Sequence, residues 1–201
     1  MDYFALSGRD TDRVYALLAG LVTPRPIAWV TTVDAAGRVN AAPFSFFNLL
    51  GVSPPVVALG VGDRDDGTPK DTALNIAATG EFVVNLVDEP LCAAMVSTAR
   101  ELPYGESELP GAGLSPAPSR LVRPPRVDGV PAALECRLLQ ALTVGDNRIF
   151  LAQVLAVHAR EGVVDPARLR VKPGAHAPVG RLHSPDGYCR TTDRFSVPWP
   201  E

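Results

Sequence analysis

The sequence has few of the residues that build metal sites and disulfide frameworks. It contains three cysteines and three histidines among 201 residues. Cys92, Cys136 and Cys189 are far apart and odd in number, which favours reduced thiols over disulfides or a zinc site. A catalytic triad or a tris-imidazole metal site would have to use nearly all of the histidines. We therefore expect no bound metal.

The chain also lacks a large charge of one sign and a long apolar run. Its formal net charge is −3 with no basic run, so nucleic acid is not an expected partner. No stretch approaches the ~18–20 apolar residues that span a bilayer, and the amino end is charged where a signal peptide is apolar. The expected location is therefore cytoplasmic, with no membrane partner.

Several nucleotide-binding and catalytic motifs are missing as well. No Gly-x-Gly-x-x-Gly follows an expected strand, so a Rossmann fold has no support. The sequence has no Gly-x-Ser-x-Gly elbow, no His-Glu-x-x-His and no Walker lysine loop. Its chemistry must therefore come from residues outside these motifs.

What the chain does contain is a series of β-like runs. The composition, 46% hydrophobic and 20% charged, predicts one globular domain over residues 1–201. Strands are expected at 27–33, 38–47, 56–61, 81–87, 133–144 and 148–160. Helices are expected after Asp10, from Thr68 to Gly80, and over 88–100. Because most of the strands are linked by hairpins, the pattern predicts a mainly β fold, an antiparallel barrel with peripheral helices.

The stretch 24–55 contains the most unusual of these strands. Its return arm, 38–47, includes Pro43, and a proline within a strand implies an edge, a bulge or an end with unpaired backbone groups. The residues at 45–48, Ser-Phe-Phe-Asn, then place a hydroxyl, two aromatic faces and an amide together. This set suits a flat ring with polar edges.

The start of the helix expected at Thr68 is a second candidate site. Thr68 at the N-cap, Pro69 at the first helical position and Asp71 three residues after the cap form a capping-box pattern. The exposed N–H groups of the first turn, with the Lys70 ammonium and the Thr72 hydroxyl, would form a site for a phosphate monoester. The alternative is an ordinary capping box on a surface helix.

Two other features remain open to interpretation. The segment 101–131 is rich in proline, glycine and serine, and a loop of this length is usually a lid or a surface that packs on a partner. His158 stands alone at the end of a strand, where a structural role is more common than a chemical one.

We call the polar and aromatic residues 45–48 the ring ledge. Together with the candidate anion site at Lys70 and Thr72, the ring ledge suits a ligand with a flat heteroaromatic head and a phosphate tail, and FMN is the commonest such cofactor. The chain resembles the flavin reductase-like family of FMN-binding split barrels over nearly its whole length. The segments that carry the resemblance are, in order, PRPIAWVTTVDAAGRVNAAPFSFFNLLGVSPPVVALG, KDTALNI, EFVVNL, GDNRIFL and YCRTTDRF. The first of these segments is the most specific.

The resemblance implies an antiparallel split β-barrel that binds FMN, with FAD as the alternative flavin, and that takes electrons from NAD(P)H. The family is typically dimeric, with each flavin near the subunit interface, so a homodimer is expected. A partner oxygenase is one expected electron acceptor. The residues that match the family's flavin contacts are Arg25, Thr31, Thr32, Asn40, Ala41, Ser45, Phe46, Phe47, Asn48, Lys70, Asp71, Thr72 and Asn75.

One position departs from the family pattern. Many flavin reductases carry a histidine associated with nicotinamide binding where this chain has Asn147. The candidates for the nicotinamide or second-substrate side are then His158, Arg181 and Tyr188.

Three functions follow as hypotheses. The first is an NAD(P)H-dependent FMN oxidoreductase that reduces flavin or a small acceptor, a reaction that demands no general acid or base. The second is an FMN-binding electron carrier or flavin store with no nicotinamide site, which Asn147 favours. The third is a split barrel that binds another planar ligand, such as haem.

Overall fold

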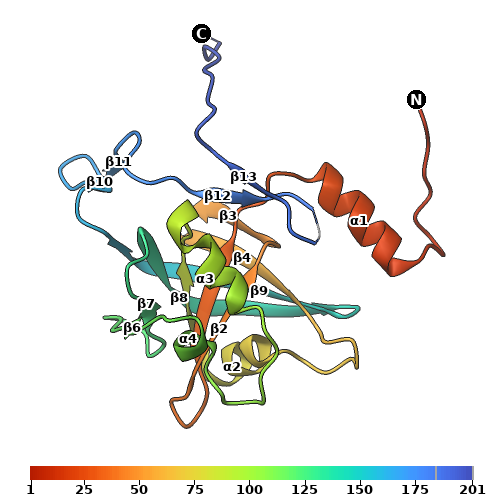
Figure 1. The fold of residues 1–201 in the computed structure, drawn as a ribbon, viewed down its shortest axis with the longest axis horizontal. Coiled ribbons are helices and arrows are strands. Elements are labelled where there is room, and N and C mark those ends of the chain that lie inside the picture. The colour runs from red at the N-terminus through yellow and green to blue at the C-terminus, as the bar shows by residue number, and fades with distance from the viewer. Residues whose placement is uncertain (184, 201) are drawn as a thin grey trace.

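The centre of the computed structural model, which describes residues 1–183 and 185–200, is a curved antiparallel sheet (Figure 1). Its seven strands are β1 (Ala28–Val33), β2 (Val39–Phe44), β3 (Phe47–Val52), β4 (Pro55–Gly62), β5 (Glu81–Asn85), β8 (Ala132–Val144) and β9 (Asn147–Ala159). They lie in the order β2-β1-β5-β8-β9-β4-β3, and every neighbouring pair is antiparallel. The prediction of a mainly β, antiparallel fold is confirmed.

The helices and short strands lie around this sheet (Figure 1). The helices are α1 (Thr11–Leu21), α2 (Asp71–Thr79), η1 (Glu89–Leu91), α3 (Cys92–Ser97) and α4 (Glu108–Gly111). The short strands are β6 (Pro116–Ala117), β7 (Arg126–Val127), β10 (Val164–Asp165), β11 (Arg170–Val171), β12 (Val179–Arg181) and β13 (Tyr188–Arg190). None of the helices in the described residues is long and apolar enough to cross a membrane.

The alternation of side chains along β1 separates two apolar cores. Ala28 and Val30 point to the concave side, where Ile76 of α2 and Phe82 of β5 pack against them. Trp29 points to the other side, into a cluster with residues of β5, α3, α4 and β7. Because both faces of β1 are covered, all six of its residues are buried.

Strand β2 is one edge of the sheet, and its backbone pairs with β1 on one side only. The N–H of Ala41 points away from β1 and donates to the Glu108 carboxylate at 2.8 Å. In an antiparallel strand, residues two apart direct their backbone groups to the same side, so Pro43 also faces outward. Its missing N–H therefore costs the sheet no hydrogen bond, and the expectation of an edge at Pro43 is correct.

The elements differ from the expected ones in three places. The expected strand 38–47 is two strands, because the chain turns at Ser45 and Phe46 and begins β3 at Phe47. The helix expected from Thr68 begins at Asp71. Its N-cap residue is Lys70, whose side chain makes no capping hydrogen bond, so the prediction of a capping box at Thr68 is wrong. The Thr68 hydroxyl bonds to Asp66 in the preceding loop instead.

The third difference lies after β5. The helix expected over 88–100 is shorter: a 3-10 turn, η1, leads into α3, which ends at Ser97. The segment 101–131, expected to be a loop, contains α4 and the ribbon β6–β7. Leu109 of α4 and Val127 of β7 are buried in the outer core, so this segment is part of the packed fold.

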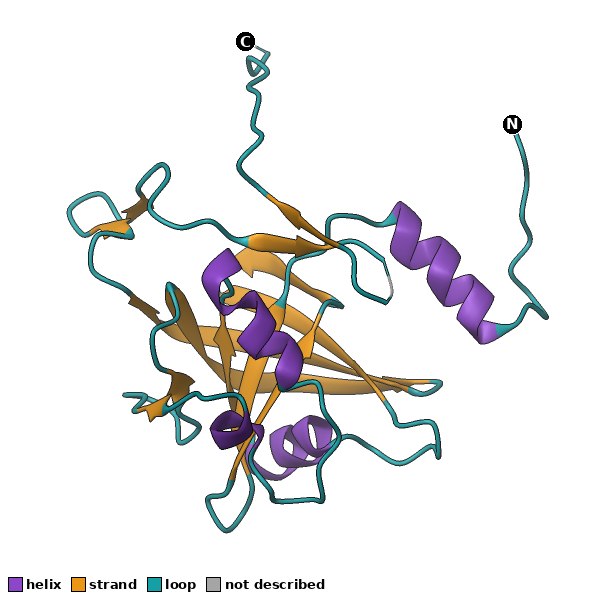
Figure 2. Cartoon of the chain, in the orientation of Figure 1, coloured by secondary structure: helices purple, strands orange, loops and turns teal. Residues whose placement is uncertain are grey.

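Two terminal elements extend from the barrel (Figure 2). The helix α1 stands apart from the sheet, and Ala19 is its one buried residue. The ribbon β12–β13 is held to the start of the central stretch, because the backbones of Arg25 and Arg181 exchange hydrogen bonds of 2.8 and 2.9 Å. Gly180 is required there, since a Cβ on it would lie 2.7 Å from the Pro24 Cβ.

A buried carboxylate lies at the end of β8–β9 away from their hairpin. Glu135 accepts hydrogen bonds from the backbone N–H groups of Arg120, Leu121 and Val122 and contacts the Nε2 of His158. Burial by itself raises the pKa of the Glu135 carboxyl, but the bonds from His158 and the backbone outweigh burial and lower that pKa. This contact with Glu135 favours the structural role for His158.

Replacement of Glu135 by Gln should destabilise the fold by about 1.5–3 kcal/mol at neutral pH, because an amide donor then faces backbone donors. A carboxyl with a lowered folded-state pKa stabilises above its unfolded-state value, here 4.5, and loses that contribution as the pH falls through the folded-state value. The deficit of the variant should therefore shrink in acid, as measured by urea unfolding across this range. Glu161→Gln, at an exposed position, is the control. A deficit that does not change with pH would contradict this account.

Candidate functional site

Three pockets follow one another along the free edge of β2 and the turn after it. The hairpin pocket lies beside the tip of the β8–β9 hairpin, the helix pocket at the start of α2, and the ribbon pocket beside β12–β13. The helix and ribbon pockets share Pro43 and Phe44, and the ribbon and hairpin pockets share Ser45. The three therefore form one continuous candidate site on a single stretch of chain.

The hairpin pocket has a volume of about 600 Å³ and mostly apolar walls. Its lining residues are Val22, Pro24, Arg25, Pro26, Ser45, Phe46, Phe47, Asn48, Ala58, Gly60, Val144, Asn147 and Ile149. All four residues of the expected ring ledge, 45–48, are among them. Phe46 is about half exposed and stands edge-on to Tyr15, at 6.3 Å between ring centroids. Asn147, at the tip of the β8–β9 hairpin, lines another wall of this pocket.

Arg25 is the buried cation of the hairpin pocket. It is 5% exposed, and its guanidinium donates to the carbonyl oxygens of Ala19 and Val22 and to the Ser45 hydroxyl. These bonds tie the end of α1 to the ledge. Its remaining nitrogen, Nη2, is buried and has no acceptor among the described residues. A buried donor without a partner costs about 1–3 kcal/mol, so this nitrogen favours a ligand oxygen or nitrogen at the site.

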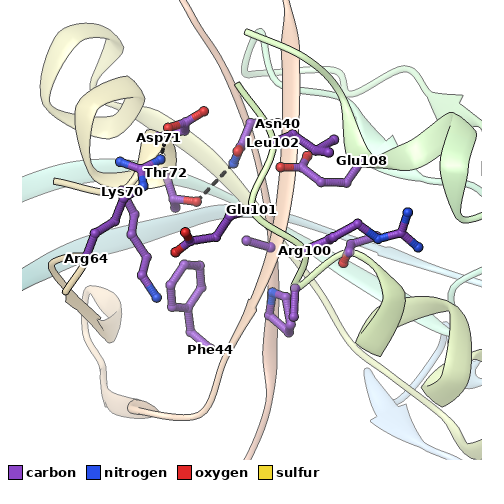
Figure 3. Close-up of a pocket in the computed structure, with 14 residues that line it drawn as sticks. Asn40, Phe44, Arg64, Lys70, Asp71, Thr72, Arg100, Glu101, Leu102 and Glu108 are labelled. Carbon is purple, nitrogen blue, oxygen red and sulfur yellow. Dashed lines mark hydrogen bonds and ion pairs between the residues drawn. The ribbon is translucent and has the colours of Figure 1, made fainter. Parts of the chain in front are cut away.

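The helix pocket lies between β2, the start of α2 and the segment after α3 (Figure 3). Its volume is about 100 Å³. Its lining residues are Asn40, Ala42, Pro43, Phe44, Arg64, Lys70, Asp71, Thr72, Thr98, Ala99, Arg100, Glu101, Leu102 and Glu108. The two expected parts of the anion site, Lys70 and Thr72, are both in this wall.

Charge at the helix pocket is distributed unevenly. Asp71 forms an ion pair with Arg64, which neutralises both (Figure 3). Lys70 has no carboxylate within 4 Å in the parts of the chain that the structure covers. Among the described residues, no group accepts a hydrogen bond from the first backbone N–H groups of α2. Glu101 and Glu108 also line this pocket, and Glu108 accepts a hydrogen bond from the Ala41 N–H. None of the described carboxylates lies within 4 Å of the Lys70 ammonium, so an anion at this end of the pocket can pair with Lys70.

A buried polar network supports the wall behind Thr72. Asn40 donates to the Thr72 hydroxyl at 2.9 Å and lies 3.4 Å from the Thr32 hydroxyl. Asn75 donates to Thr32 at 3.0 Å, and its side-chain oxygen accepts from Tyr104 at 3.1 Å. These hydrogen bonds hold the side chains of β1, β2 and α2 in fixed positions.

Some of the expected flavin contacts do not line any of the three pockets. The Thr31 side chain is completely buried; its hydroxyl donates to the carbonyl of Pro125 and lies 3.2 Å from the Asn85 amide. Thr32 and Asn75 belong to the network behind the wall, and the Ala41 side chain lies in the outer core. Their direct contact with flavin stays a prediction.

Glu108, which lines the helix pocket, was not among the residues predicted from the sequence. It comes from α4, in the segment expected to be a loop. Its carboxylate accepts the hydrogen bond from the outward N–H of Ala41. Burial raises the pKa of its carboxyl, although the bond from Ala41 acts in the opposite direction. No short motif surrounds Glu108, so only the tertiary fold brings it to β2.

The ribbon pocket, of about 270 Å³, brings together two of the three second-substrate candidates. Arg181 and Tyr188 both line it, and the Arg181 guanidinium lies 4.7 Å from the centre of the Tyr188 ring. His158 is at the opposite end of β9 from Asn147, paired with Glu135. The structure therefore does not place His158 with the other two.

Comparison with known proteins is consistent with this geometry. A model of the flavin reductase like domain matches residues 20–190. The 2-nitrobenzoate 2-nitroreductase NbaA of Pseudomonas fluorescens superposes with a TM-score of 0.90 at 36% identity, over 99% of this chain and 96% of that one. Nitrilotriacetate monooxygenase component B of Bacillus cereus superposes with a TM-score of 0.90 at 32% identity, over 98% of both chains.

A more distant structure identifies the barrel type. A split-barrel protein of Shewanella frigidimarina superposes with a TM-score of 0.82 at 18% identity, over the full length of both chains. The resemblance read from the sequence motifs is thus confirmed at the level of fold and family. The chain belongs to the family of the flavin reductase like domain.

Proposed function

We propose that this chain binds FMN along the free edge of β2 and uses it to pass electrons from NAD(P)H to free flavin or a small acceptor. The observation that carries the proposal is a pair of neighbouring pockets. The apolar one contains a buried donor, Arg25 Nη2, with no partner among the described residues, and the other contains Lys70, which pairs with no described carboxylate. A flat ring with polar edges fits the first, and a phosphate fits the second.

The residues present fit each part of FMN. Lys70, the Thr72 hydroxyl and the first N–H groups of α2 would hold the phosphate. Phe46 and Phe47 would contact the ring, while Arg25, Ser45 and Asn48 offer polar groups to its edge. When bound, FMN supplies the ability to accept a hydride and pass on its electrons. The protein contributes orientation and exclusion of water from the ring.

The relatives support an oxidoreductase role. One similar protein is named as a nitroreductase and another as a component of a monooxygenase. Both names are consistent with delivery of electrons to a small molecule or to a partner oxygenase. FAD remains the alternative flavin, and the expected location is cytoplasmic.

A second candidate function is an FMN-binding electron carrier or flavin store without a nicotinamide site. The observation that favours it is Asn147, which lines the hairpin pocket where many flavin reductases carry histidine. Reduction would then come from a partner protein.

Consumption of NADH and NADPH by the pure holoprotein distinguishes the two functions. The proposed function predicts turnover at ordinary enzyme rates with at least one nucleotide, in the presence of excess FMN as acceptor. The measurement is the loss of absorbance of the reduced nucleotide. The absence of turnover with both would exclude the reductase and leave the carrier.

Removal of the Lys70 ammonium by Lys70→Ala should weaken FMN by about 1.5–3 kcal/mol, because the variant loses a charge-assisted hydrogen bond to the phosphate. The dissociation constant can be followed by quenching of FMN fluorescence. Lys172→Ala, at the chain's other lysine, is exposed and should leave that constant unchanged. An unaltered affinity in Lys70→Ala would remove the phosphate assignment.

We also propose a homodimer, because the chain exposes large apolar side chains near the candidate site. The exposed residues on or next to α1 and β3 and on the β8–β9 hairpin include Leu18, Leu21, Val22, Phe46, Leu49, Leu50, Val52, Leu139, Leu142 and Val144. Surfaces of this kind mark interaction sites more often than free solvent-facing surface.

Sedimentation equilibrium of the full chain should therefore give about twice the mass of one chain, 21.3 kDa. Leu21→Glu should shift the population toward monomer, because it places a charge in the apolar interface. Glu161→Gln should not change the mass. A monomer at all concentrations of the unaltered chain would refute the dimer.

A further inference from the structure

The ribbon pocket differs from the other two in its volume and its lining. It is lined by three aromatic rings, from Tyr15, Phe44 and Tyr188, together with the side chain of Arg181. Apart from Ser45, the remaining lining residues are apolar: Ile27, Pro43, Met95, Val96, Ala99 and Pro185. Its volume of about 270 Å³ is below the ~300–1,000 Å³ of pockets for drug-sized ligands. A molecule with a single ring is therefore of the right size, and a dinucleotide is too large.

The charge in this pocket is a single unneutralised guanidinium. Arg181 donates to two neutral carbonyls, at 2.7 Å to Pro185 and 3.3 Å to Gly187. No carboxylate lies within 4 Å of it among residues 1–183 and 185–200. Burial raises the pKa of the Tyr188 hydroxyl, so that group is uncharged at neutral pH. The pocket is therefore positively charged. By contrast, the charge of the nearby Arg190 is neutralised by an ion pair with Glu89.

The backbone fixes Arg181 relative to the ledge. Its N–H and C=O pair with those of Arg25, and the Arg25 side chain donates to the Ser45 hydroxyl at 3.2 Å. Ser45 lines both the ribbon pocket and the hairpin pocket. A ligand that contacts Arg181 is therefore held beside the surface where the flavin ring is proposed to lie.

We propose that the ribbon pocket binds a small aromatic carboxylate as the second substrate, with the carboxylate on the Arg181 guanidinium and the ring among Tyr15, Phe44 and Tyr188. A guanidinium offers paired donors that match a carboxylate, and the neighbouring rings favour a planar partner over an aliphatic one. Its role as second substrate rests on the proposed function, whereas the binding itself does not.

Equilibrium binding of benzoate to the purified full chain tests this proposal, with benzamide as the neutral molecule of the same shape. Titration calorimetry should show benzoate bound about 10- to 150-fold more tightly than benzamide, the range expected for a charge-assisted hydrogen bond. Cyclohexanecarboxylate, which keeps the charge and loses the planar ring, should bind more weakly than benzoate. Equal affinities for benzoate and benzamide would overturn the proposal without recourse to any variant.

Variants on the ribbon then assign the site. Arg181→Gln should lose the preference for benzoate over benzamide, whereas Arg190→Gln, on the same ribbon but outside the pocket, should keep it. Arg181→Lys keeps the charge and should retain part of the preference, which covers the case in which Arg181→Gln disturbs the turn at Pro185. A preference unchanged in Arg181→Gln would place the benzoate elsewhere and overturn the assignment.

The flavin content of each sample separates the two proposals. Benzoate that binds flavin-free protein through Arg181 would support the pocket even if the protein proved to have no affinity for FMN. Conversely, an FMN-loaded protein that binds benzoate and benzamide equally would leave the proposed function standing and remove the aromatic carboxylate.

Discussion

Within the described part of the chain, strand β2 pairs with β1 alone, and the candidate site depends on how its outer edge is satisfied. Exposed edges pair readily with other strands, so proteins protect them. Here the protection has two parts. Pro43 removes one outward donor, and the Glu108 carboxylate occupies another, at Ala41. Pockets, and not another strand, lie along the outer side of β2. A planar ligand with polar edges can therefore occupy the position of a neighbouring strand.

Rigidity behind the edge comes from buried polar contacts. The hydroxyl and amide groups of Thr32, Asn40, Thr72 and Asn75 bond to one another across β1, β2 and α2. Such a network is unfavourable when partly satisfied and stabilising when complete. It links the start of α2, where the proposed phosphate site lies, to the strand that carries the ring ledge. The separation between the two halves of the site is therefore set by the core and not by a mobile loop.

The strands and the ledge could be predicted from sequence because local chemistry determines them. A run of β-branched residues with one tryptophan specifies β1, and the proline in VNAAPF marks the edge of β2. Thr68 was misleading, because Asp66 satisfies its hydroxyl in the loop and the helix starts three residues later. Glu108 and the Arg25–Arg181 pairing were beyond local reasoning, since each joins segments that are far apart in the sequence.

The bridge between Arg25 and Arg181 also sets the order in which the site can be completed. A ribosome delivers the ledge before the ribbon β12–β13, and amino-terminal parts of a chain generally fold first. The strands of the sheet, α2 and Glu108 all precede residue 160, so every residue that lines the helix pocket is synthesised before the ribbon. The wall that carries Arg181 comes from a later segment. Changes in the ribbon can therefore alter the ribbon pocket and, through Pro24 and Arg25, the hairpin pocket, while the helix pocket shares no residue with the ribbon.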